Sequence, residues 1–302
     1  MILAERLSPT DLQSLLLEVY RVRTDQMTPA KVLRDYQSNR FVHPSPVAPA
    51  SASRWESIAL SLLPREFQPL TLSPVCPLGT NSVVAAVDQN WAVATARNTE
   101  VVSDATNVLA LECALRRREL LRRDTRSPVA VHLAASHRLL RAQRYEAADA
   151  LPHFASVVLC SAGRDTGNLR FELSALARHI TYYLRSLRAY VGPDVPLHVS
   201  ATDLRSDRRM GVIEERLFPQ IRLHLEDVSC RIDEKRPSGR GYYRDLCYHI
   251  HATTASRRKV ELVDGGSVDW TRKLLSNEKE RPVISGIGSE RLCTEFPERP
   301  DR

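Results

Sequence analysis

The chain has 302 residues, of which 43% are hydrophobic and 26% charged, a balance typical of a globular protein that buries a core. No apolar run approaches the ~20 residues that a membrane-spanning helix needs, and no basic segment precedes an apolar one at the N-terminus. We therefore expect no membrane span and no secretory signal.

Six cysteines are scattered without short paired spacing, which argues against a disulfide framework and a zinc knuckle and favours a cytoplasmic protein. The formal net charge of +7 is compatible with an anionic partner, either nucleic acid or nucleotide. Basic residues are densest from Arg116 to Arg123. There they indicate either the solvated face of a helix or a contact to a phosphate backbone.

Residues 1–50 predict a helical N-terminal extension followed by a Pro-rich linker. Ser8-Pro9 and Thr28-Pro29 each pair a capping residue with proline at the first helical position, so a helix is expected after each of them. Three prolines between residues 43 and 53 predict a loop.

Residues 51–302 are expected to form one core domain. Its first helix places Trp55, Ile58, Ala59 and Leu62 on one face. Extended segments follow over residues 67–79 and 90–101.

The middle of the chain predicts a helix between extended segments. The helix covers residues 106–123 and is expected to turn Val108, Leu111 and Leu115 inward. Two short β-rich runs then flank a polar loop from Arg138 to Pro152.

The C-terminal half gives the strongest local signals. Residues 171–192 form a long amphipathic pattern that Gly192-Pro193 ends. Residues 242–253 and 259–266 predict an antiparallel pair, and residues 282–292 predict a strand that runs into a helix. Long helices beside mainly antiparallel strands give the α+β class, with the sheet flanked by helices.

Two Gly-containing runs near the C-terminus are candidate ligand contacts. One runs from Val263 to Trp270 and contains Gly265-Gly266, and the other runs from Ser285 to Leu292. Small residues let a ligand lie against a strand backbone, and Arg291 could stack on or pair with a planar or phosphorylated group. The alternative is close packing between strand and helix.

Three arginines recur every third residue in the predicted polar loop: Arg138, Arg141 and Arg144. Guanidinium groups that converge in a loop suit phosphate oxygens, and the alternative is an exposed basic hairpin. Asp104 and Thr106 stand at a helix start, where capping explains them as well as a ligand does. Tyr242 and Tyr243 form an aromatic pair that core packing explains equally well.

Taken together, these segments resemble the catalytic core of class II aminoacyl-tRNA synthetases. They are most similar to the histidyl enzyme and to the regulatory subunit of ATP phosphoribosyltransferase, over about residues 52–296. The helix from Trp55 and the strand ending at Ser73-Pro74 resemble the first motif, which implies a homodimer. Residues 137–143 resemble the second motif, and Gly265-Gly266 with residues 286–291 resemble the third.

The resemblance implies ATP with Mg²⁺, an amino acid or related carboxylate as substrate, and a tRNA or carrier protein as a possible acceptor. The implied site residues fall into three groups: catalytic Arg138, Arg240 and Arg291; ATP-binding Arg138, Arg141, Gly286, Gly288, Glu290 and Arg291; and amino-acid-binding Asp104, Thr106, Tyr242, Tyr243 and Gly265.

Several positions depart from the family pattern. Leu140 and His249 each stand where the family has glutamate, and Phe154 stands where a glutamine would read a histidine side chain. From the few residues that follow Glu295 we expect no anticodon-binding domain. Histidine is therefore disfavoured as the substrate. Three hypotheses remain open. The first is an ATP-dependent ligase that forms an adenylate, which the retained arginines favour, and the second is a non-catalytic regulatory or assembly subunit. The third, a nucleic-acid-binding module, rests on net charge alone.

Overall fold

The structure of the chain, a computed structural model, describes residues 2–143, 151–205, 211–225 and 227–297. The chain forms two compact units. Unit 1 comprises residues 1–46, 73–104 and 138–154, and unit 2 comprises residues 47–72, 105–137 and 155–302. None of the helices in the described ranges is both long enough and apolar enough to cross a bilayer.

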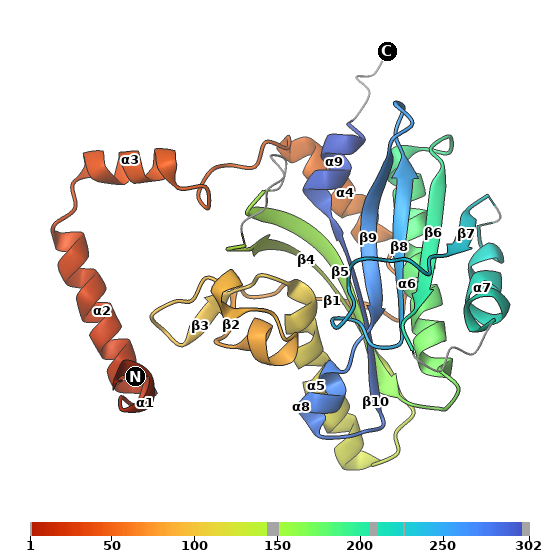
Figure 1. Cartoon of the computed structure of the whole chain (residues 1–302), viewed down its shortest axis with the longest axis horizontal. Coiled ribbons are helices and arrows are strands. Elements are labelled where there is room, and N and C mark those ends of the chain that lie inside the picture. Colours follow the sequence, from red (N-terminus) through yellow and green to blue (C-terminus); the bar gives the residue numbers. More distant parts are fainter. Residues whose placement is uncertain (1, 144–150, 206–210, 226, 298–302) are drawn as a thin grey trace. The chain divides into compact units, whose positions relative to one another are not determined.

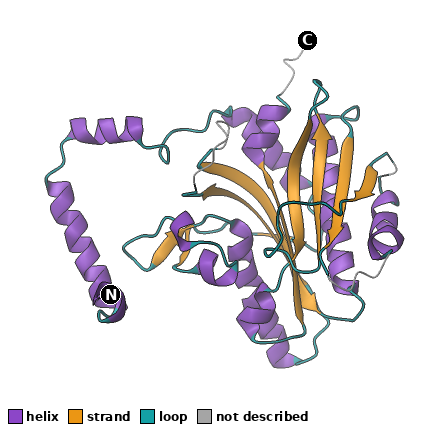
Figure 2. Ribbon diagram, in the orientation of Figure 1, coloured by secondary structure: helices purple, strands orange, loops and turns teal. Residues whose placement is uncertain are grey.

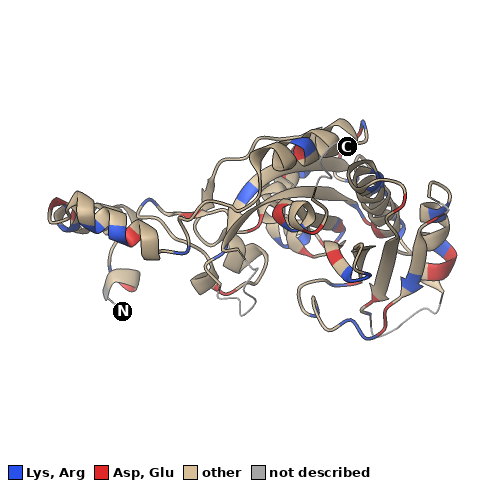
Figure 3. Ribbon diagram, turned by 90° about the horizontal axis from the view of Figure 1, so that it is seen from above, with Lys and Arg blue, Asp and Glu red and all other residues tan. Residues whose placement is uncertain are grey.

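Unit 1 begins with three helices, α1 (Ile2–Glu5), α2 (Pro9–Asp25) and α3 (Pro29–Ser38). The side chains of Ser8 and Thr28 cap α2 and α3, as the sequence predicted. Helices α2 and α3 carry both basic and acidic residues, and some of these pair with one another, as Arg21 does with Glu18 and Asp25 (Figure 3). These pairs are exposed, so each contributes little to stability.

The rest of unit 1 is organised around a buried carboxylate. Strands β2 (Val75–Pro77) and β3 (Thr99–Val101) form an antiparallel pair, beside the π-helical turn η1 (Thr80–Val84) and the 3₁₀ turn η2 (Gln89–Trp91). Glu100 of β3 is fully buried and accepts hydrogen bonds from Gly79, Asn81 and Gln89. Although burial opposes ionisation, these donors lower the pKa of Glu100, so the carboxylate holds this loop together.

Unit 2 is built on an eight-stranded sheet in the order β1-β4-β5-β10-β9-β8-β6-β7, to which unit 1 adds only the ends of β4 and β5 (Figures 1 and 2). Four adjacent strand pairs, from β5 through β10, β9 and β8 to β6, are antiparallel. This confirms the predicted α+β class with a mainly antiparallel sheet. The strands are β1 (Gln68–Pro69), β4 (Val131–Leu140), β5 (His153–Arg164), β6 (Leu197–Asp203), β7 (Ser229–Ile232), β8 (Leu246–Thr253), β9 (Lys259–Ser267) and β10 (Glu280–Gly288).

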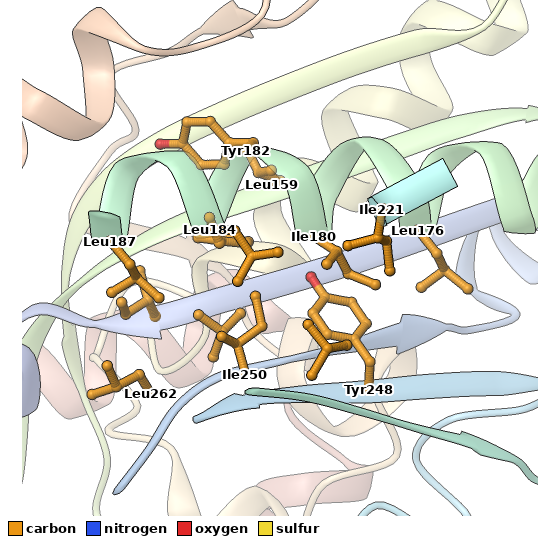
Figure 4. Close-up of a cluster of buried hydrophobic side chains, with 14 of the residues drawn as sticks. Leu159, Leu176, Ile180, Tyr182, Leu184, Leu187, Ile221, Tyr248, Ile250 and Leu262 are labelled. Atoms are coloured by element: carbon orange, nitrogen blue, oxygen red, sulfur yellow. The ribbon is translucent and has the colours of Figure 1, made fainter. Parts of the chain in front are cut away.

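The core lies between the sheet and the long helix α6 (Arg170–Val191), which ends at Gly192 as predicted. Figure 4 shows Ile180, Leu184 and Leu187 of α6 above Ile250 and Leu262 of the sheet. The remaining helices of unit 2 are α4 (Pro49–Ser61), α5 (Ala105–Arg123), η3 (Val212–Leu217), α7 (Phe218–Arg222), α8 (Trp270–Leu275) and α9 (Ser289–Glu295).

Helix α5 forms where expected, but its buried face differs from the prediction. Leu109 and Cys113 are fully buried, whereas Leu115 is 50% exposed. The buried face of α5 carries small residues, which let the helix pack closely against its neighbours. The spacing of its leucines therefore does not predict which face is buried. Arg117 is also fully buried and makes a bidentate ion pair with Glu280. The basic run of this helix is therefore partly interior and not a continuous solvated face.

Three predicted boundaries were wrong. The loop predicted over residues 43–53 ends earlier, because Pro49 starts α4 at the first helical position. Only Thr99–Val101 of the extended segment 90–101 is a strand. Strand β4 continues to Leu140, so Arg138 lies in a strand and not in the polar loop. In α4 itself, Trp55 and Ala59 are buried, but Leu62 lies beyond the helix end and is 40% exposed.

Candidate functional site

The hairpin of β8 and β9 sorts its side chains onto two faces. Tyr248 and Ile250 point into the core beneath α6, so His249 and His251 lie on the opposite face. Across the ladder His249 pairs with Asp264, and His251 pairs with Glu261. Two imidazoles and two carboxylates therefore meet on one patch of the sheet.

A glycine-rich turn carries the predicted tyrosine pair onto this patch. Gly239 and Gly241 both adopt positive φ, and the backbone N–H groups of Tyr242 and Tyr243 donate to the Gly239 carbonyl. The two rings lie edge to face at 5.0 Å between centroids. Tyr243 is buried against Gly266, where any side chain would meet the ring: a Cβ would lie 2.6 Å from it.

Arg236 is buried beside this pair. Its side chain is 1% exposed, and its guanidinium carbon lies 5.3 Å from the centre of the Tyr243 ring. Nη2 donates to Asp264 at 2.7 Å and Nε donates to the Ser238 carbonyl at 2.9 Å, while buried Nη1 has no hydrogen-bond partner. Buried arginine normally satisfies its donors, so Nη1 is an unmet donor within the described residues.

We call this group the polar cluster: Arg236, Tyr243, His249, His251, Glu261 and Asp264. His249 lies between two carboxylates, with Nδ1 3.5 Å from Glu261 and Nε2 3.4 Å from Asp264. Burial, and then the charge of Arg236, lowers the pKa of His249 to about 4. Burial also lowers the pKa of His251 to about 4 and raises the pKa values of Glu261 and Asp264. The environment thus disfavours charge on each of these four groups.

The residues of unit 2 that were predicted to bind ATP lie at the end of β10 and at the start of α9. Gly286 lies beside Val158 and Ser156 of β5, and Gly288 caps α9 without a side chain. Glu290 is buried and accepts from the Ala155 N–H at 2.7 Å. Arg291 is exposed, and its guanidinium donates to the Glu261 carbonyl at 3.4 Å. Arg291 therefore reaches the backbone of the polar cluster.

Two residues predicted for the amino-acid pocket lie inside unit 2. At Gly265 a Cβ would meet Ser285 and Tyr248, so the missing side chain serves close packing under α6. Thr106 is buried in the first turn of α5. Neither belongs to the polar cluster.

The other predicted residues lie in unit 1, where they contact one another. Arg138 is exposed and bonds His153 at 2.8 Å. Arg141 donates to the Ser103 carbonyl and approaches the Asp104 carboxylate at 3.6 Å. A residue predicted to bind phosphate and one predicted to bind an ammonium group thus form an ion pair. Arg144, the third arginine of the series, lies outside the described residues.

Two comparisons by sequence identify no family. A profile for the tetratrico peptide repeat matches residues 129–193. Such repeats are pairs of helices, whereas the described part of this range holds β4, β5 and α6. A search of curated proteins gives no match.

Solved structures give matches along most of the chain. An ATP phosphoribosyltransferase regulatory subunit/histidyl-tRNA synthetase from Bacillus halodurans matches with a TM-score of 0.59 and 13% identity, over 85% of this chain and 83% of the other. Apo histidyl-tRNA synthetase from S. aureus gives 0.58 and 13%, over 84% and 70%. The RNA-binding domain of threonyl-tRNA synthetase from Cryptosporidium parvum gives 0.54 and 10%, over 83% and 66%.

The chain has the class II aminoacyl-tRNA synthetase fold. At these identities the likeness is one of fold, and it confirms the fold that the sequence motifs predicted.

Within this class II fold, the arginine beside the tyrosine pair differs from the one the sequence suggested. Arg240 is exposed and bonds only backbone carbonyls, those of Arg236 and Glu234, among the described residues. Arg236 is the buried one. Its segment, Asp233 to Arg240, consists mostly of charged and turn-forming residues, and such a composition predicts an exposed loop. His249 and His251 did carry a signal, since residues two apart on a strand share a face.

Proposed function

We propose that this protein activates an amino acid or a related small carboxylate by forming an adenylate with ATP. The observation that supports the proposal best is the polar cluster. It gathers a buried cation with an unpaired N–H, two carboxylates and an aromatic wall within one class II fold. Sites that bind small molecules commonly combine apolar walls with a few convergent polar groups whose pKa values are perturbed.

In this proposal the cluster receives both charged ends of an amino acid. The unpaired Nη1 of Arg236 suits a carboxylate, and the half-exposed carboxylate of Asp264 suits an ammonium group. The substrate carboxylate would attack the α-phosphorus of ATP, forming a new C–O–P link while the bond to pyrophosphate breaks. Arg291, which reaches the backbone of the cluster, would stabilise the charge that develops, with Mg²⁺ carried by ATP.

A regulatory or assembly subunit is the second candidate, and two residues favour it. Leu140 and His249 replace acidic groups that the resemblance leads us to expect in an active enzyme. A regulatory subunit could still bind a small molecule at the polar cluster without turning it over. We further propose that the protein is a cytoplasmic homodimer, and that a tRNA or carrier protein accepts any activated group.

The proposal is tested by ATP–pyrophosphate exchange with the purified full chain and Mg²⁺, against each of the twenty amino acids. We expect exchange with one amino acid, and its loss in Arg291→Ala and Arg236→Met. The control is Arg126→Ala, which removes an exposed arginine away from the cluster and should leave exchange unchanged.

Calorimetry separates the two candidates. Binding of ATP together with an amino acid but no exchange would favour the regulatory subunit. Absence of both exchange and ATP binding would reject adenylate formation.

A further inference from the structure

Two histidines of the polar cluster have ring nitrogens without hydrogen-bond partners. His249 is 5% exposed and its buried Nε2 makes no hydrogen bond, and the same holds for Nδ1 of His251. Leaving a buried polar group unsatisfied costs about 1–3 kcal/mol. Elsewhere in unit 2 the buried His179 satisfies both its nitrogens, through Ser161 and Ser285. Nε2 of His137, outside the cluster, also has no partner, but the cluster is where two such nitrogens come from neighbouring positions on one strand face.

The hairpin places a carboxylate next to these imidazoles. His249 and His251 share a face of β8, and Glu261 lies across the ladder from His251. One ligand atom from each of the three side chains lies within 4.8 Å of the other two. At metal–ligand distances of about 2.1 Å, ligand atoms around a tetrahedral ion are about 3.4 Å apart, so small side-chain rotations would close the site.

We propose that His249, His251 and Glu261 bind one divalent transition-metal ion of the zinc class, with a fourth position left for water or a substrate atom. Two imidazoles and one carboxylate are a ligand set that zinc uses in catalytic sites, where one position stays open. If Nδ1 of His249 binds the ion on the Glu261 side, Nε2 faces Asp264. A carboxylate that orients the second nitrogen is the usual outer partner of a metal-bound histidine.

The surrounding charges allow a cation without favouring it strongly. Glu261 and Asp264 supply carboxylate oxygens, and each histidine has a ring nitrogen that makes no hydrogen bond. Arg236 lies within the cluster, and the charges of Lys259 and Arg231 also act on His251. We therefore expect reversible binding, unlike that of a structural zinc whose removal unfolds a domain.

The test uses Zn²⁺ and Co²⁺ as probes on the full chain, without ATP or amino acid. Calorimetry should give one Zn²⁺ per chain, and Co²⁺ should give visible absorption of a four- or five-coordinate site without a thiolate charge-transfer band. Glu261→Gln and His251→Gln should each weaken Zn²⁺ binding at least about 10-fold. His224→Gln, which removes an exposed histidine outside the cluster, should leave it unchanged.

Equal Zn²⁺ affinity in the wild type and both cluster variants would overturn the inference, as would absence of binding or a thiolate band that assigns the ion to cysteine. Glu261 is 43% exposed, so Glu261→Gln should fold and decide the matter even if His251→Gln does not. Because no nucleotide is present, the result is independent of adenylate formation.

Discussion

Unit 2 buries an arginine and a histidine in each of two regions, and the hydrogen bonds of these two residues differ between the regions. Near α5 and α6, Arg117 pairs with Glu280 through two hydrogen bonds, and His179 bonds two serines. In the polar cluster, Arg236 and His249 are also buried, yet each has one nitrogen that makes no hydrogen bond. The same residue types are thus fully paired in one region and keep an unmet nitrogen in the other, where we propose that a ligand binds.

The largest difference between the two regions is expected when the buried arginine of each ion pair is replaced and the free energy of unfolding is measured. Arg117→Met leaves the carboxylate of Glu280 fully buried and unpaired, so the free energy of unfolding should fall by about 3–5 kcal/mol. Arg236→Met leaves Asp264, which is 43% exposed and can be hydrated, so the loss should be less than half as large. Denaturant unfolding measures both, and equal losses would mean that Arg236 is mainly structural.

Replacing one histidine in each region should give a smaller contrast. His179→Leu removes hydrogen bonds to Ser161 and Ser285 and strands two buried hydroxyls, so it should cost about 1–3 kcal/mol. His249→Leu removes a ring whose Nε2 makes no hydrogen bond, and its effect should stay within about 1 kcal/mol of zero. A larger loss at position 249 than at 179 would contradict the comparison.

The dependence of stability on pH should sharpen the comparison further. Burial lowers the pKa of His179 well below its usual value of 6.5, so the folded chain resists a proton that the unfolded chain accepts. Stability should therefore fall as the pH drops below about 6.5, with this residue adding up to ~1.4 kcal/mol per pH unit. Unfolding at several pH values between 7 and 5 should give a shallower slope for His179→Leu, and an unchanged slope would reject this role.

Local signals predicted the C-terminal fold well. Alternation and turn residues located the β8–β9 hairpin, and Gly192 marked the end of α6. The face of α5 could not be predicted in this way, because burial of Cys113 and exposure of Leu115 depend on what packs against the helix. A local sequence pattern shows the periodicity of a helix, but it does not show which elements pack against each of its faces.

The candidate site was less predictable than the fold. The tyrosine pair and the approach of Arg291 to the cluster follow from motifs, whereas the burial of Arg236 does not. Only tertiary contacts with Tyr243 and Asp264 take a charged loop residue out of water. The meeting of His249 with Glu261 depends on the register of the hairpin, including an irregularity near Ile250.

The polar cluster should be sensitive to a substitution at Gly266, although Gly266 is not one of its members. A methyl group at this position would lie 2.6 Å from the Tyr243 ring and 2.7 Å from the Leu246 carbonyl, so the ring would have to lift. Arg236 rests against that ring, and its charge contributes to the low pKa of His249. A single added carbon at position 266 would therefore displace Tyr243, a member of the cluster, although it touches none of the cluster's charged groups.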